Sequence, residues 1–230
     1  MTDGDRVLRF YFDYLSSNAW LAWRQLPALA AKHGVAIEPV PVLFAGLLEA
    51  HGQLGPAEIP AKTRWMVRNN LRKAALLGVP LRPPVHHPFN PLLALRVSSL
   101  PLEASRRTAL VEGLFRAVWV EGLHVSEPAV VERVADAAGL DGGALVAEAQ
   151  TPEAKARLRR QTDDAIAKGV FGVPTVKLGG ELFWGYDDFP WLELVLAGRD
   201  PLDPETAARW TGPPRPSALR ERVRTKAEGS

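Results

Sequence analysis

The sequence predicts an α/β fold in which a large all-helical insertion divides a four-stranded mixed sheet into a βαβ half and a ββα half. Three observations predict this fold. Residues 7–44 show a strand, helix, strand pattern, residues 45–164 show almost only helical periodicity, and residues 165–200 return to a helix, two short strands and a helix. The chain has 230 residues, of which 47% are hydrophobic, so it can build a sizeable core without disulfides or a structural metal.

The first strand is predicted at residues 7–13, where VLRFYFD is short, aromatic and suited to burial. From 18 to 33, apolar residues recur at a spacing of three and four, which predicts a helix that ends at Gly34. The second strand is predicted at residues 35–44, and its two prolines indicate an edge position or an early end. These elements together form a parallel βαβ unit with a right-handed crossover.

The helical insertion follows the second strand. Residues 59–78 have its clearest helical pattern, with Pro60 near the start and Gly78 at the end. A proline-rich connector is expected at residues 79–91. Further helices are predicted at about 91–100, 102–121, 127–139 and 152–168.

The C-terminal half contains a β-hairpin at residues 172–185, because Gly179-Gly180 separates two short strands there. A last helix is predicted at residues 187–198. This order of elements is typical of a thioredoxin-like domain. The predicted division is a thioredoxin-like domain at 1–44 and 165–200, a helical insertion domain at 45–164, and an irregular tail rich in proline and arginine at 201–230.

Composition excludes several kinds of function. The chain has no cysteine, which excludes disulfides, thiolate metal sites and redox chemistry on thiols of its own. The formal net charge is only +2, so we expect no nucleic-acid partner. No apolar run approaches the ~20 residues of a membrane helix, and the first residues, MTDGDR, are polar, so we expect a cytoplasmic protein that does not enter a membrane.

Four segments resemble one known family. They are FYFDYLSSNAWLAW at the first strand, EIPAKTRWMVRNNLRKAALLGVPL and HHPFNPLLALR in the insertion, and GVFGVPTVKLGGELFWGYDD at the hairpin. In combination they resemble the 2-hydroxychromene-2-carboxylate isomerases and kappa-class glutathione transferases, which have a DsbA-like thioredoxin fold. The resemblance spans residues 10 to about 198. It implies glutathione as cofactor, a homodimer, and a serine where thiol oxidoreductases carry a cysteine.

Two positions depart from the family pattern. The family usually has Ser-Pro after the first strand, where this chain has Ser16-Ser17. It often has Trp-Gly-Asn-Asp near the end, where this chain has Trp184-Gly185-Tyr186-Asp187. Both departures are compatible with glutathione binding, and they affect the expected identity of the isomerase substrate more than the expected thiol site.

Ser16 is the predicted catalytic residue. A serine here also suits a simple helix cap. However, the unpaired N–H groups and the dipole at a helix N-terminus favour negative charge, and a hydroxyl that donates to a thiolate lowers the pKa of the thiol. Together with the resemblance, this favours Ser16 as the group that holds the sulfur of glutathione as a thiolate, with Ser17 or Asn18 as the helix cap.

Glutathione binding is predicted at three further places. The resemblance implies that the backbone of Val173, before Pro174, pairs with the cysteinyl part of glutathione like a short added strand, although a simple turn proline is the alternative. Asp187 and Asp188 begin the predicted last helix, where they either cap it or take the ammonium of the γ-glutamyl group. Lys62 matches a family position that contacts glutathione or an anionic substrate, although such charges usually lie on a solvated helix face.

The substrate pocket is predicted to involve Asn90 and Trp65. The alternatives are a turn residue before a helix for Asn90 and a core position for Trp65. His86 and His87 do not predict a metal site, because adjacent side chains point apart and no carboxylate or thiol ligand is nearby in the sequence.

The resulting hypothesis is a glutathione-dependent isomerase of the 2-hydroxychromene-2-carboxylate type, active in the metabolism of aromatic compounds. The resemblance implies that the thiolate adds to an electrophilic carbon, the ring opens, a bond rotates and the thiolate leaves, so glutathione is not consumed. Three alternatives stay open: a kappa-like glutathione transferase, a non-catalytic glutathione-binding protein of the thioredoxin fold, and a DsbA-like disulfide oxidoreductase. The absence of cysteine argues against the last, since no mixed disulfide with the protein can form.

Overall fold

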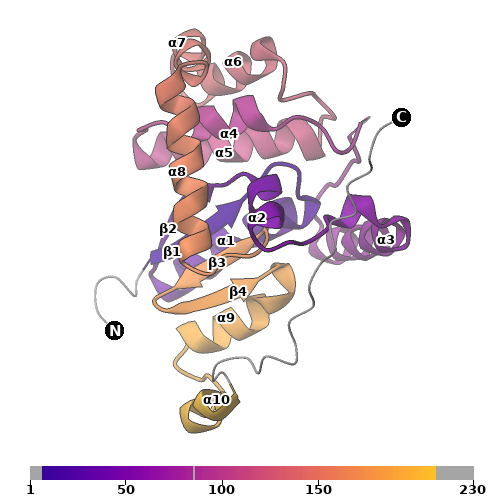
Figure 1. Ribbon diagram of the computed structural model, residues 1–230, viewed down its shortest axis with the longest axis vertical. Helices are drawn as coiled ribbons and strands as arrows, with labels where there is room; N and C mark the ends of the chain where they lie inside the picture. The colour runs from indigo at the N-terminus through magenta and orange to yellow at the C-terminus, as the bar shows by residue number, and fades with distance from the viewer. Residues whose placement is uncertain (1–6, 85, 211–230) are drawn as a thin grey trace, which may run out of the picture.

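The structure is a computed structural model that describes residues 7–84 and 86–210. The strands of this part of the chain form one sheet (Figure 1), and they are β1 (Val7–Phe12), β2 (Ala36–Pro41), β3 (Thr175–Leu178) and β4 (Glu181–Trp184). Their order is β2-β1-β3-β4, with β1 parallel to β2 and antiparallel to β3, and β3 antiparallel to β4. The predicted four-stranded mixed sheet is confirmed.

β2 ends at Pro41, earlier than the sequence predicts. The N–H of Phe44 donates to Oδ2 of Asp13 at 3.0 Å. The Asp13 side chain thus binds the N–H of Phe44, which a longer β2 would need for hydrogen bonding within the sheet. The helix α2 (Phe44–Ala50) begins at this point instead.

Two long helices lie on either side of α2 in the sequence. α1 (Ser17–His33) connects β1 to β2, while the short 3₁₀ helix η2 (Pro56–Glu58) and α3 (Pro60–Leu77) follow α2. α1 and α3 end, as predicted, at glycines with a left-handed backbone, with φ of 63° at Gly34 and 62° at Gly78. Side chains other than glycine rarely adopt this conformation, so both glycines are suitable helix stops.

The rest of the insertion is helical, as predicted, and α8 runs from its other helices to the sheet (Figure 1). Four helices match predicted ones. α7 is an addition, and it begins where the Asp141 side chain accepts the N–H of Ala144 at 2.9 Å. The predicted domain boundary at 164/165 falls within α8. The helices are α4 (Leu92–Ser99), α5 (Ala104–Trp119), α6 (Pro128–Ala137), α7 (Gly142–Ala149) and α8 (Pro152–Ala167).

An aromatic cluster joins the insertion to the sheet. The ring centroid of Phe115 in α5 lies 5.3 Å from that of Phe12 and 4.8 Å from that of Tyr14. It lies 6.1 Å from the ring of Trp20 and 6.4 Å from that of Trp23, both in α1. All five side chains are buried. The insertion and the sheet therefore share one hydrophobic core.

The two faces of β1 are covered by different helices. Phe10 packs toward α1, with its ring centroid 5.5 Å from that of Trp23. Tyr11, the next residue, belongs to a second cluster with Ala165 of α8. Because successive side chains of a strand point to opposite faces, α1 and α8 lie on opposite sides of the sheet.

The C-terminal part contains η3 (Tyr186–Asp188), α9 (Phe189–Leu196) and α10 (Pro204–Trp210). The predicted last helix is therefore divided into η3 and α9. The prediction of irregular structure over 201–230 was wrong for α10, where Oδ2 of Asp203 accepts the N–H of Thr206 at 2.8 Å and stabilises a first turn. The rest of that tail, residues 211–230, lies outside the described residues. No helix in the described part of the chain has the length and apolarity needed to cross a membrane.

Candidate active site

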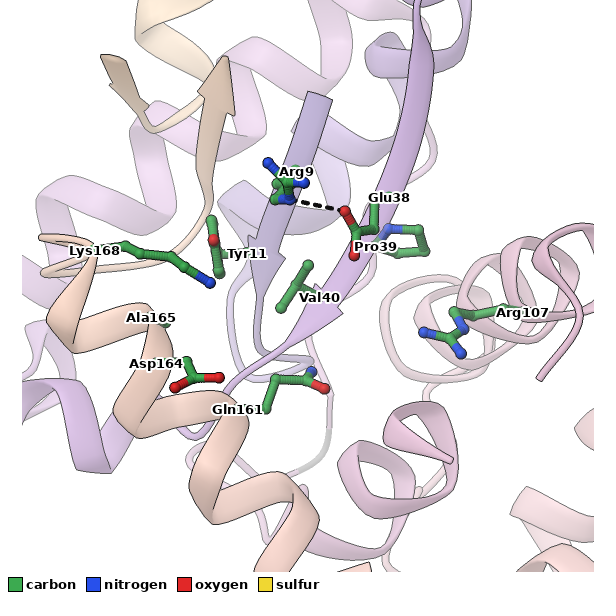
Figure 2. A pocket seen from close by; sticks show the side chains of 10 residues that line it. All are labelled: Arg9, Tyr11, Glu38, Pro39, Val40, Arg107, Gln161, Asp164, Ala165 and Lys168. Carbon is green, nitrogen blue, oxygen red and sulfur yellow. Dashed lines mark ion pairs between the residues drawn. The ribbon is translucent and has the colours of Figure 1, made fainter. Parts of the chain in front are cut away.

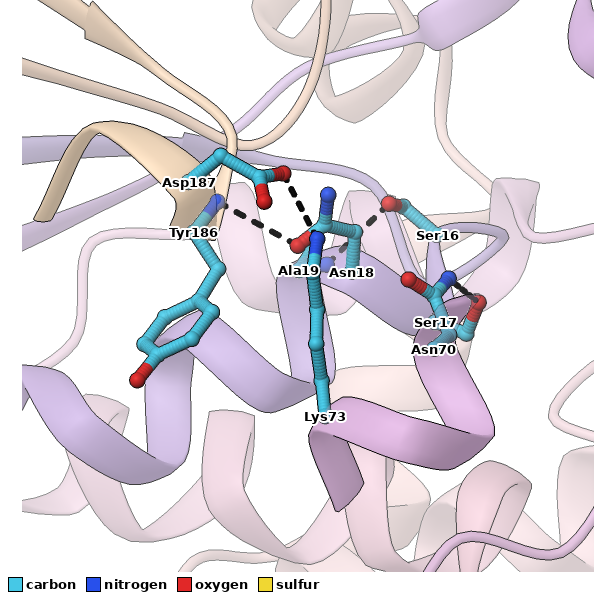
Figure 3. A network of polar contacts seen from close by, with 8 residues as sticks. All are labelled: Ser16, Ser17, Asn18, Ala19, Asn70, Lys73, Tyr186 and Asp187. Atoms are coloured by element: carbon cyan, nitrogen blue, oxygen red, sulfur yellow. Dashed lines mark hydrogen bonds and ion pairs between the residues drawn. The ribbon is translucent and has the colours of Figure 1, made fainter. Parts of the chain in front are cut away.

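Ser16 lies between β1 and α1, with its hydroxyl at the first turn of the helix (Figure 3). Its N–H donates to the carbonyl of Asp13 at 3.1 Å, and its Oγ accepts the N–H of Ala19 at 3.1 Å. Ser16 is thus the N-cap of α1 itself, which corrects the expectation that Ser17 or Asn18 would be the cap. The bond from Ala19 uses a lone pair of the hydroxyl, so the hydroxyl hydrogen can still be donated to an anion.

The start of α1 is a suitable environment for an anion. The helix has 17 residues and no acidic side chain in its first turn. The helix dipole and the first N–H groups are therefore not compensated by a carboxylate of the helix itself. Ser16 is partly exposed, so a ligand can reach its hydroxyl from solvent.

Polar contacts join this first turn to α3 and η3 (Figure 3). Asn70 of α3 donates from Nδ2 to Oγ of Ser17 at 2.8 Å. The N–H of Tyr186 in η3 donates to Oδ1 of Asn18 at 3.2 Å. The side chains of Ser17 and Asn18 are thus used to hold two other segments beside Ser16.

An ion pair lies next to this turn. Nζ of Lys73 is 2.6 Å from Oδ2 of Asp187, and the Lys73 side chain is only 12% exposed whereas that of Asp187 is 63% exposed. Asp188 is engaged differently, because its Oδ2 accepts the N–H of Trp184 at 2.8 Å. Asp187 is therefore the carboxylate that a ligand at this site can reach, and it is held by a cation that the sequence alone did not indicate.

Val173 and Pro174 lie at the same end of the sheet as Ser16. β3 runs antiparallel to β1 with Thr175 opposite Tyr11, so Val173 lies close to the end of β1 that leads into Ser16. The Val173-Pro174 peptide bond is cis. Among the described residues, no hydrogen bond is recorded for the N–H or carbonyl of Val173, which leaves both for a ligand backbone.

Asp13 connects the end of β1 to the surroundings of Ser16. It is fully buried, and its carboxylate accepts the N–H groups of Leu15 and Phe44, each at 3.0 Å. Burial raises the pKa of the Asp13 carboxyl to about 6, although these two hydrogen bonds act in the opposite direction. This buried group was not singled out in the sequence, and its place directly after an aromatic strand was the available signal.

We expect the Asp13 carboxyl to make stability depend on pH. Since its pKa is higher in the folded chain than the ordinary aspartate value of 3.8, the folded state binds the proton more tightly. The free energy of unfolding should therefore fall as pH rises from about 4 to about 6, with a contribution of roughly 2–3 kcal/mol from this group. Urea unfolding at a series of pH values would measure it, and Asp13→Asn should remove this part of the slope. Equal slopes in both proteins would contradict the assignment.

A family model described as the DSBA-like thioredoxin domain matches residues 7–197. The chain belongs to this family. A 2-hydroxychromene-2-carboxylate isomerase of Pseudomonas putida is 32% identical over 193 residues, which cover 83% of this chain and 94% of that protein. Glutathione S-transferase kappa 1 of Homo sapiens is 25% identical over 225 residues, covering 89% of this chain and 97% of that protein.

A solved structure also shows that this DSBA-like thioredoxin chain has the fold of a 2-hydroxychromene-2-carboxylate isomerase. The structure of a 2-hydroxychromene-2-carboxylate isomerase matches with a TM-score of 0.76 and 30% identity, and the match covers 84% of this chain and 95% of that one. Together with the sequence relatives, it confirms the predicted resemblance and the predicted enzyme class, an isomerase.

Three predicted site residues of this DSBA-like chain lie apart from the cluster around Ser16. Lys62 is exposed in the first turn of α3, about 12 Å along the helix axis from Asn70, eight residues later. Trp65 is 64% exposed, so it is not a core residue. Asn90 accepts the N–H of Leu92 at 3.0 Å and so starts the turn into α4. Among the described residues, no recorded polar or ring contact joins these three side chains to the cluster.

His87 approaches the cluster from the proline-rich connector. Its Nε2 lies 2.9 Å from the carbonyl oxygen of Leu15, directly before Ser16. Its ring centroid is 5.9 Å from that of Trp119. The part of the chain that the structure describes contains no group of three or more histidine or acidic side chains arranged to hold a metal ion. Because of its contact with the carbonyl of Leu15, we interpret His87 as a residue that supports the turn before Ser16.

Gly185 connects β4 to η3 with a backbone conformation that requires glycine. Its φ of 77° and ψ of 167° define a backbone region that is essentially restricted to glycine. A Cβ atom at this position would lie 3.5 Å from Nδ2 of Asn18 and 3.6 Å from Oδ2 of Asp187.

Gly185→Ala should lower the free energy of unfolding by about 1–3 kcal/mol because of backbone strain. If the Ser16 site holds glutathione, the variant should also bind it more weakly, because a backbone that leaves this glycine-only conformation would displace Asp187, two residues later. Urea unfolding and calorimetric titration with glutathione would measure the two effects. Gly180→Ala is a matched control in the same hairpin, since a Cβ there meets nothing within 4 Å. Equal effects of the two substitutions would contradict the special role of Gly185.

Proposed function

We propose that the protein is a glutathione-dependent isomerase of the 2-hydroxychromene-2-carboxylate type, with Ser16 as the residue that stabilises the glutathione thiolate. One observation carries this proposal: in a chain without cysteine, the Ser16 hydroxyl caps a 17-residue helix and keeps its own hydrogen for an anion. The names of the P. putida and human relatives support the reaction and the cofactor respectively.

The residues around Ser16 fit the groups of glutathione. The free N–H and carbonyl of Val173 suit the cysteinyl backbone, which would add to them like a short strand. The exposed carboxylate of Asp187 suits the γ-glutamyl ammonium, and Lys73 beside it suits the neighbouring carboxylate. Asp188 supports this arrangement through its bond to the backbone of Trp184.

The substrate would approach from the α3 side of this site. Lys62 and Trp65 would supply a positive charge and an aromatic surface for an aromatic carboxylate, and Asn90 would contribute a polar group from the start of α4. When bound, glutathione would supply a nucleophilic sulfur that is regenerated in each turnover. The role of the chain is to keep that sulfur ionised and to orient the substrate against it.

The test measures binding and reaction separately. Calorimetric titration should show saturable binding of glutathione, and 2-hydroxychromene-2-carboxylate should isomerise only when catalytic amounts of glutathione are present. Mass analysis of the products distinguishes the alternatives, since a transferase would release a glutathione conjugate. Binding without turnover would indicate a non-catalytic glutathione-binding protein, and an absence of binding would reject the whole proposal.

Two further parts of the proposal concern the state of the protein in the cell. We propose a cytoplasmic location, because glutathione is kept largely reduced there and the free thiol is the form that the site would use. We also propose a homodimer, in line with the resemblance to the kappa-class transferases. Light scattering after gel filtration should give the mass of two chains, and the mass of one chain would reject the dimer.

A further inference from the structure

A small polar cavity lies between the sheet and α8, on the face of β1 opposite to α1 (Figure 2). Its volume is about 180 Å³, which is smaller than the roughly 300–1,000 Å³ of pockets for drug-sized ligands. None of the residues clustered around Ser16 lines it. The side chains that matter for its chemistry are Arg9, Tyr11, Glu38, Gln161, Asp164 and Lys168.

Tyr11 provides a hydroxyl in the wall of this cavity. The residue as a whole is only 2% exposed, and no hydrogen bond to its hydroxyl is recorded among the described residues. Burial raises the pKa of the Tyr11 phenol, so at neutral pH it keeps its proton and can donate it. The hydroxyl oxygen is not among the enclosed polar atoms that lack a partner, so it is open to the cavity and can donate to a ligand there.

Most of the other polar groups around the cavity are already engaged. Nε of Arg9 pairs with Oε2 of Glu38 at 2.9 Å. Nη2 of Arg107 donates to the carbonyls of two residues before α5, and Nε2 of Gln161 donates to that of Pro41 at 2.6 Å. These bonds hold the wall in place and leave few groups for a ligand.

Two charged side chains of opposite sign remain available to a ligand in the cavity. Asp164 and Lys168, one turn apart at the end of α8, are both exposed at the mouth of the cavity, and neither has a side-chain hydrogen bond or ion pair recorded within the described ranges. Figure 2 shows the end of the Lys168 side chain next to Tyr11, and Asp164 one turn earlier on α8. A simple anion would meet the carboxylate of Asp164, and a simple cation would meet the ammonium of Lys168. A ligand that carries both charges close together satisfies both groups and the Tyr11 hydroxyl.

We propose that this cavity is a binding site for a small zwitterion of the α-amino acid class. The carboxylate of the ligand would accept hydrogen bonds from Lys168 and from the Tyr11 hydroxyl. Its ammonium would donate to Asp164 and to the amide oxygen of Gln161. The cavity is too small for glutathione, so the inference stands apart from the proposed function of the Ser16 site.

The test uses the full chain and glycine, the smallest such zwitterion. Acetate and methylammonium serve as matched probes that each carry one of its charges. Amide chemical shifts of β1 and of the end of α8 should change saturably with glycine, and at least about tenfold higher concentrations of either single-charge probe should be needed. Tyr11→Phe keeps the ring and removes the hydroxyl, and it should weaken glycine binding by roughly tenfold.

Two further variants make the result specific. Asp164→Asn should remove the preference for glycine over acetate. Lys155→Met changes an exposed residue of the same helix that does not line the cavity, and it should leave glycine binding unchanged. The proposal is overturned if glycine produces no saturable shifts, if acetate binds as well as glycine to the unmodified chain, or if Tyr11→Phe binds glycine as tightly as the unmodified chain does.

Discussion

Replacement of Ser16 by alanine should raise the pKa of the bound glutathione thiol by about one to two units. Within residues 7–84 and 86–210, the Ser16 hydroxyl accepts only from the N–H of Ala19, so its hydrogen is free for the sulfur and the substitution removes that donor. A hydrogen bond to a charged group contributes about 1.5–3 kcal/mol, and each pKa unit corresponds to about 1.4 kcal/mol. Titration of the thiolate absorbance in the complex would measure the pKa directly.

Turnover of the Ser16→Ala protein should fall by about tenfold or more at pH 7. An unperturbed thiol is only a few per cent ionised at that pH, so the loss follows from the smaller thiolate fraction. The rate should recover as pH approaches about 9, because the thiol then ionises without help. A loss of the same size at every pH would instead indicate damage to the structure of the site.

Ser16 also caps α1, and that role must be separated from its effect on sulfur. Ser16→Asp should keep the cap, since aspartate caps helices about as well as serine, but its negative charge should repel the thiolate. Thr151 caps α8 in the same way, through its bond from the N–H of Ala154, and lies outside the site. Thr151→Ala should therefore lose about 1 kcal/mol of stability without any change in the thiol pKa. Full activity of Ser16→Asp would reject the proposed role of Ser16.

The sequence predicted those features of the fold that depend on local patterns. The aromatic strand of residues 7–13, the glycine stops at Gly34 and Gly78, and the Gly179-Gly180 turn each have a local physical cause, and the structure contains all of them. The end of β2 was predicted too late, because the side chain that binds the N–H of Phe44 comes from Asp13, far away in the sequence. α10 was missed because the composition of the whole tail concealed a short capped helix.

The candidate site was predictable where its residues adjoin strand ends. Ser16, Val173 and Asp187 each follow or precede a strand of the sheet, so the topology brings them together. Asn70 and Lys73 were not predictable, because they belong to a long, largely exposed helix on which polar residues are ordinary. Their contacts with Ser17 and Asp187 depend on the position of α3 against α1, which no local pattern specifies.

Phe115→Ala should lower the free energy of unfolding by about 3–5 kcal/mol, the usual cost of removing a buried phenylalanine side chain. Phe115 is fully buried. Its ring meets Phe12 at the end of β1, Tyr14 just after β1, and two tryptophans of α1. For a chain of this length, the melting temperature should fall by roughly 10 °C. Thermal and urea unfolding followed by circular dichroism would measure both quantities.

The same variant tests whether the insertion and the sheet unfold together. In a Trp119→Phe background, the buried tryptophans are Trp20 and Trp23 of α1, so fluorescence reports largely on the sheet side, whereas circular dichroism reports mainly on the helices of the insertion. Because Phe115 belongs to the insertion and packs on the sheet side of the core, its loss should shift both signals equally. Phe115→Leu keeps most of the buried volume and should cost less than about 1.5 kcal/mol. Two separate transitions, with only the circular dichroism signal shifted, would mean that the insertion is an independent domain and that the shared aromatic cluster does not couple it to the sheet.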